Sequence, residues 1–70
     1  MQLVINGQLK EFPELSAESK VSDLVAALGL KNDRVALEQN GEIVPRATWI
    51  ETPVRSGDKL EIVHFVGGGC

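Results

Sequence analysis

The feature that most restricts the fold of this chain is a single helical pattern. Four apolar residues recur at the i, i+3, i+4 and i+7 spacing that lines one face of a helix: Val21, Leu24, Val25 and Leu28. Ser22 is the expected N-cap, and Asp23 lies near the positive end of the helix dipole. Gly29 is the expected C-terminal stop, with Leu30 packing back on the last turn. A sheet built by the rest of the chain therefore has one short helix to cover it.

Strand signals lie on both sides of this helix. Residues 1–6 largely alternate between apolar and polar side chains, Gly7 supplies a turn, and residues 8–12 return as a second strand that ends at Pro13. After the helix, Asn40-Gly41 lies between two apolar runs, which is the strongest short-range signal for a β-hairpin. Pro45 ends this second hairpin.

The C-terminal third contains an irregular stretch and one more strand. Trp49 and Ile50 are expected to be anchored in the core, and residues 56–58 (Ser-Gly-Asp) form a turn. Residues 59–66 form the last strand. If Leu60 and Ile62 face the helix, Val63 and Phe65 are left on the open face of the sheet.

The element order is therefore strand, strand, helix and three further strands, which is the order of a β-grasp fold. This is an α+β architecture with a mixed five-strand sheet around one main helix, and the crossover helix allows the first and last strands to lie parallel. We expect one β-grasp domain at residues 1–66 and a flexible glycine tail at residues 67–70.

Composition restricts the location and the partners. A chain of 70 residues buries only about 60% of the surface that its unfolded form exposes, and small secreted domains usually compensate for this with disulfides. Because this chain has one cysteine, it cannot form an internal disulfide, and a reducing, cytoplasmic location is expected. The start of the chain has no secretory leader pattern, and no apolar stretch approaches the roughly 20 residues of a membrane span. The net charge is -3 and there is no basic cluster, which argues against binding of nucleic acid. The chain has one histidine and one cysteine, too few for a metal site built from these residues.

The chain ends in HFVGGGC, where three glycines follow the last strand directly. Glycines form a slim segment that can enter a narrow channel, and from Phe65 to Gly69 the chain reaches about 14 Å at roughly 3.5 Å per residue. A carboxylate on glycine is also unhindered. Val63, Phe65 and Val66 would then form the partner-docking surface beside the tail, although isolated exposed apolar residues are also common.

Several stretches resemble the ThiS family, the small sulfur-carrier proteins of thiamin biosynthesis, which have a ubiquitin-like β-grasp fold. They are NGEIVPR, VPRATW, SGDKLEIV and EIVHFVGGG, and the resemblance covers residues 1–69. It implies a carrier that is not an enzyme, is monomeric when free and holds no cofactor. The resemblance further implies that a ThiF-type, E1-like adenylyltransferase consumes ATP to adenylate the carboxylate of Gly69. A sulfur-transfer system then forms a thiocarboxylate for a ThiG-type thiazole synthase, with Gly67 and Gly68 as the approach.

Cys70 departs from this pattern, because it locks the carbonyl of Gly69 in a peptide bond. Cys70 is an added residue, a native extension that a peptidase removes, or a group that itself reacts through an acyl shift. Two other functions also remain open, since a molybdopterin-type sulfur carrier and a ubiquitin-like protein modifier have the same fold and tail.

The remaining polar residues suggest weaker sites. His64, the one histidine, is expected to have a structural position at the edge of the sheet. The charged residues near the last strand are solvated surface groups or steer a partner of complementary charge: Arg46, Arg55, Asp58 and Glu61.

Overall fold

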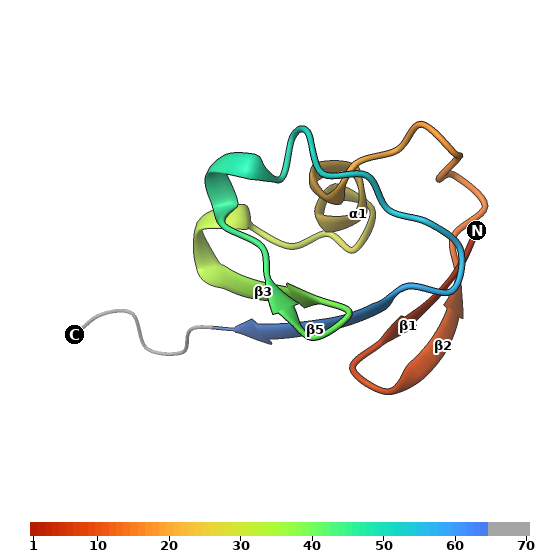
Figure 1. The fold of residues 1–70 in the computed structure, drawn as a ribbon, viewed down its shortest axis with the longest axis horizontal. Coiled ribbons are helices and arrows are strands. Elements are labelled where there is room, and N and C mark those ends of the chain that lie inside the picture. Colours follow the sequence, from red (N-terminus) through yellow and green to blue (C-terminus); the bar gives the residue numbers. More distant parts are fainter. Residues whose placement is uncertain (65–70) are drawn as a thin grey trace.

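The computed structural model describes residues 1–64 of the chain. Its elements are β1 (Gln2–Ile5), β2 (Gln8–Glu11), α1 (Val21–Ala27), β3 (Val35–Gln39), β4 (Glu42–Ile43) and β5 (Lys59–His64), with 3₁₀ helices at Asn32–Arg34 and Arg46–Thr48. The strands form one sheet in the order β2-β1-β5-β3-β4, and α1 packs on one side of it (Figure 1). β1 and β5 are parallel and the other neighbours antiparallel. The predicted β-grasp fold with a mixed five-strand sheet is therefore confirmed; the predicted domain boundary at residue 66 lies outside the described residues.

Two asparagine-glycine pairs form the hairpin turns. Asn6 and Gly7 have φ values of 51° and 83°, and Asn40 and Gly41 have values of 53° and 87°. Positive φ at both central residues is the type I′ geometry, whose twist matches that of the flanking strands. The predicted Asn40-Gly41 hairpin is confirmed, and the first hairpin uses the same residue pair, not Gly7 alone.

The start of α1 differs from the sequence prediction. Ser22 is not the N-cap, because the helix begins at Val21 and Lys20 occupies the cap position with extended backbone. The carboxylate of Asp23 accepts a hydrogen bond from the Lys20 N–H at 2.8 Å. Val21 and Ser22 donate their own N–H groups to carbonyls of a distant segment, at residues 52 and 49. Tertiary backbone contacts therefore satisfy the first turn, so no serine cap is needed.

The end of α1 follows the prediction. Gly29 has a φ of 73°, a left-handed conformation that glycine adopts without strain. Its N–H donates to the carbonyl of Ala26, and the N–H of Leu30 donates to that of Val25, which together form a Schellman motif. Leu30 packs half-buried against the core, as expected.

The core lies between α1 and the sheet. Its buried members are Leu3, Ile5, Phe12, Leu15, Val21, Leu24, Val25, Val35, Leu37, Trp49, Val54, Leu60 and Ile62. Trp49 is buried as predicted, and its indole N–H donates to the carbonyl of Val44 at 2.8 Å. The prediction for Ile50 is wrong, since this side chain is 75% exposed. At the end of the 3₁₀ helix Arg46–Thr48, Trp49 points into the core, whereas Ile50, the next residue, lies outside the core.

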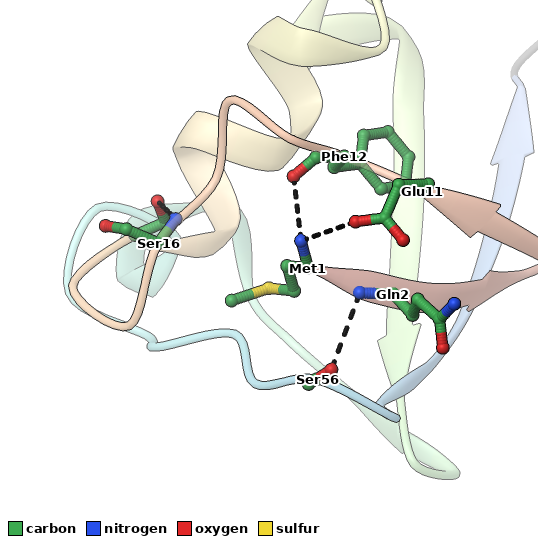
Figure 2. A network of polar contacts seen from close by, with 7 residues as sticks. Met1, Gln2, Glu11, Phe12, Ser16 and Ser56 are labelled. Atoms are coloured by element: carbon green, nitrogen blue, oxygen red, sulfur yellow. Dashed lines mark hydrogen bonds and ion pairs between the residues drawn. The ribbon is translucent and has the colours of Figure 1, made fainter.

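The first two residues are tied to two other segments (Figure 2). The Met1 ammonium donates to the Glu11 carboxylate at 2.9 Å and to the carbonyl of Phe12 at 3.0 Å. The Gln2 N–H lies 3.4 Å from Ser56 Oγ, and the carbonyl of Gln2 accepts from the Gly57 N–H at 2.7 Å. These contacts join the start of β1 to the end of β2 and to the predicted turn before β5.

Candidate functional site

The candidate site is the part of β5 that leads to the glycines. Leu60 and Ile62 are buried beneath α1, whereas Val63 is 60% exposed on the opposite face, which confirms the prediction for these three residues. The remaining predicted site residues lie outside the described residues: Phe65, Val66, Gly67, Gly68, Gly69 and Cys70. Val63 is therefore the part of the predicted docking surface that the structure places.

Val63 belongs to a larger surface that the sequence analysis missed. Across the sheet, Val63 lies opposite Ala36, Glu61 lies opposite Glu38, and Glu38 also lies opposite Ile43. Residues directly opposite in antiparallel strands share a face. These five residues line a hollow on the face of the sheet away from α1, and the side chain of Ile43 is 74% exposed there. Extending the Asn40-Gly41 hairpin register along β3 and β4 would have placed Ile43 beside Glu38.

Asn6 holds β5 in position beyond the end of β1. Its Oδ1 accepts a hydrogen bond from the N–H of Ile62 at 2.7 Å, and its Nδ2 donates to the carbonyl of Ile62 at 3.2 Å. One side chain thus replaces the next residue of a paired strand, two residues before β5 ends at His64. The sequence predicts only a turn in this loop, and no local signal indicates the long-range contact.

Two of the predicted steering charges are used within the fold. Asp58 accepts hydrogen bonds from Gln39 Nε2 at 3.0 Å, from Asn40 Nδ2 at 3.1 Å and from the N–H of Arg55 at 2.8 Å, so it joins the second hairpin to the turn before β5. Arg46 lies 5.9 Å from the centre of the Trp49 ring, and its Nε donates to a carbonyl of the 3₁₀ helix at Asn32–Arg34.

The other polar candidates are exposed. Glu61 and the side chain of Arg55 lie at the surface. His64 is also exposed, and it ends the central strand β5 opposite Val35 instead of lying on an edge strand. Within residues 1–64, no three His, Cys, Asp or Glu side chains come close enough to hold a metal ion. In the same range, no helix is long and apolar enough to cross a membrane.

Comparison with known proteins agrees with this geometry. A sequence model of the ThiS family matches residues 3–69. The chain belongs to the ThiS family. It is 30% identical over 69 residues to the sulfur carrier protein ThiS of Escherichia coli, covering 99% of this chain and 100% of that protein. A crystal structure of the ThiS protein of Geobacter metallireducens superposes with a TM-score of 0.83 at 33% identity, covering 99% and 100% of the two chains.

Segments similar to this chain also occur within longer proteins. The chain is 48% identical over 69 residues to a thiazole synthase of Paramagnetospirillum magneticum. The match covers 99% of this chain but only 20% of that protein. A thiazole synthase of Magnetococcus marinus is 33% identical with the same coverage. This chain thus spans about a fifth of the length of these two relatives.

Proposed function

We propose that this ThiS-family chain is a sulfur carrier for the thiazole branch of thiamin biosynthesis and is not itself an enzyme. One observation carries the proposal: the family match runs from residue 3 to residue 69, so it includes all three glycines and ends at Gly69. The relatives from Escherichia coli and Bacillus subtilis are both called sulfur carrier proteins. This favours a thiamin carrier over a molybdopterin-type carrier or a protein modifier.

The proposed chemistry takes place at the carboxylate of Gly69 on two partner enzymes. One carboxylate oxygen attacks the α-phosphorus of ATP on an E1-like, ThiF-type enzyme, and pyrophosphate leaves. Sulfur then attacks the acyl carbon and AMP leaves. Sulfide gives the thiocarboxylate directly, whereas a persulfide of the sulfur-transfer system gives an acyl disulfide, whose S–S bond a thiol reductant cleaves to leave the thiocarboxylate. The chain itself holds no cofactor in this scheme, since ATP is bound and consumed by the partner. Gly67 and Gly68 add no side chains that would block a narrow channel.

Cys70 has to be absent when this chemistry occurs. While Cys70 is present, the carbonyl of Gly69 belongs to an amide, so Gly69 has no carboxylate oxygen to attack phosphorus. Either an added residue or an extension removed by a peptidase is compatible with the carrier. We place these reactions in the cytoplasm, because a lone cysteine suits a reducing compartment.

Docking of the partners is proposed at the exposed face of β5. Val63 is 60% exposed there, and the strand precedes the glycines in the sequence. A ThiG-type thiazole synthase is the proposed acceptor of sulfur, because two thiazole synthases contain a segment similar to almost the whole chain.

Mass spectrometry tests the proposed function directly. Two chains, one ending at Gly69 and one at Cys70, are incubated with the ThiF-type enzyme, ATP and a sulfide donor. We expect the chain ending at Gly69 to gain the mass difference of one oxygen replaced by sulfur. The chain ending at Cys70 should stay unchanged and is the matched control. Absence of the product from both chains, or its formation with Cys70 intact, would contradict the proposal.

A further inference from the structure

Two carboxylates face each other on the open side of the sheet without an opposing charge. Glu38 of β3 and Glu61 of β5 are direct partners in the antiparallel register. Like charges at such positions destabilise a sheet. Within residues 1–64, the one ion pair joins the Met1 ammonium to Glu11, so neither carboxylate has a cation at ion-pair distance. Lys59 lies two residues before Glu61 on the same strand, and it pairs with neither of them.

Apolar side chains border this pair of carboxylates. Ile43 lies opposite Glu38 on the outer strand, and Ala36 with Val63 forms the next row of the sheet toward the end of β5. Together they line a hollow of about 110 Å³, and Ile43 and Val63 are both largely exposed. We call these five residues the carboxylate surface: Ala36, Glu38, Ile43, Glu61 and Val63. It offers two negative charges inside an apolar border.

We propose that the carboxylate surface binds an arginine of thiazole synthase that is flanked by apolar side chains. The guanidinium group is a planar fork with five donors, so it can bridge both carboxylates, while its aliphatic stem lies along Ile43 and Val63. Binding would also remove the repulsion between Glu38 and Glu61. This inference rests on the proposed carrier function and adds to it the chemistry of the contact.

Two observations select thiazole synthase as the occupant. Val63 belongs to the carboxylate surface and precedes Gly69 by six residues in the sequence, so a protein that binds the end of the chain can also contact this surface. Thiazole synthases from two organisms contain a segment similar to almost the whole chain, which links this protein class to a ThiS-type domain.

Charge reversal at Glu61 separates binding from stability. In the full chain, Glu61→Lys creates a cross-strand pair with Glu38, so the variant should melt at a higher temperature than the wild type. The same change removes one partner of the arginine and adds a repelling charge. Affinity for the thiazole synthase of the same organism, measured by calorimetry, should fall at least about tenfold, which corresponds to roughly 1.4 kcal/mol.

The control is a charge reversal of equal size on the other side of the same sheet. Glu42 is exposed on β4, next in sequence to Ile43 and therefore on the opposite face. Glu42→Lys should leave the affinity within about twofold, because it changes the net charge but not the carboxylate surface. Glu38→Gln should also weaken binding and should reduce its dependence on salt.

The possible outcomes distinguish this inference from the proposed function. Weaker binding by Glu61→Lys and Glu38→Gln, with Glu42→Lys unchanged, supports the carboxylate surface. Equal affinity of all variants overturns it, and so does a loss seen only with the adenylating enzyme. A wild type that fails to bind thiazole synthase overturns it as well. In each case sulfur incorporation at Gly69 decides the carrier function separately.

Discussion

Asn6 shows how much one loop residue contributes to the position of β5. Its amide bonds both backbone groups of Ile62, and its φ of 51° is one that glycine also adopts without strain. We predict that Asn6→Gly keeps the turn but lowers the free energy of unfolding by about 1–2 kcal/mol, because two hydrogen bonds are lost. Urea denaturation measures this change.

A second substitution at the same site separates the two contributions. Asn6→Ala loses the same hydrogen bonds and also forces a residue with a Cβ into the left-handed region, so it should be less stable than Asn6→Gly by roughly a further 1 kcal/mol. If Asn6→Gly were as stable as the wild type, the side chain would contribute nothing to holding β5.

At the scale of the element, the start of α1 depends on Asp23 and not on Ser22. The Asp23 carboxylate accepts the Lys20 N–H and lies in the first turn, where negative charge is favourable. We predict that Asp23→Ala lowers the free energy of unfolding by about 1 kcal/mol, as the loss of a capping contact does. Ser22→Ala is the matched control, and denaturant titration should show a change of no more than a few tenths of a kcal/mol. A larger loss for Ser22→Ala would contradict this assignment of the cap.

At the scale of the whole molecule, the long connection between β4 and β5 is part of the core. Val54 is fully buried in it, and its N–H donates to the carbonyl of Ser19 at 3.2 Å. Figure 1 shows this connection passing beside α1 before it enters β5. We predict that Val54→Ala lowers the free energy of unfolding by about 2 kcal/mol, although Val54 lies outside any strand.

Exposed Ile50 in the same connection is the control. Ile50→Ala removes a larger side chain, but 75% of Ile50 is in contact with solvent, so its effect should stay below about 0.5 kcal/mol. Thermal melting of the two variants side by side measures the difference. Equal losses would contradict the packing of Val54 in the core.

Much of the fold could be predicted because its signals are local. The spacing of Val21, Leu24 and Val25 predicts the helix, and Asn40-Gly41 predicts a hairpin, since these residues prefer the backbone angles of a type I′ turn. The sequence allowed the first and last strands to lie parallel, because a crossover helix connects the two halves of the sheet, and the structure shows that β1 and β5 do pair in this way. For the candidate site, alternation along the last strand correctly placed Val63 on the open face.

Two of the predictions that failed concern contacts between distant segments. Ser22 was expected to cap the helix, but the carbonyls of Trp49 and Thr52 reach the first turn from another part of the chain. Ile50 was expected in the core, but the turn that buries Trp49 leaves its neighbour exposed. Neither outcome could be predicted from residue type, because each depends on how the connection before β5 lies against α1.

The amino-acid sequence alone was sufficient for the element order, both turns and the ThiS-type ending, because backbone preference, side-chain periodicity and motif spacing act over a few residues. Only the tertiary structure placed Glu38 opposite Glu61 and brought Asn6 to Ile62. The two carboxylates lie 23 residues apart in sequence, and Asn6 lies 56 residues from Ile62. Only the register of the assembled sheet brings these groups together.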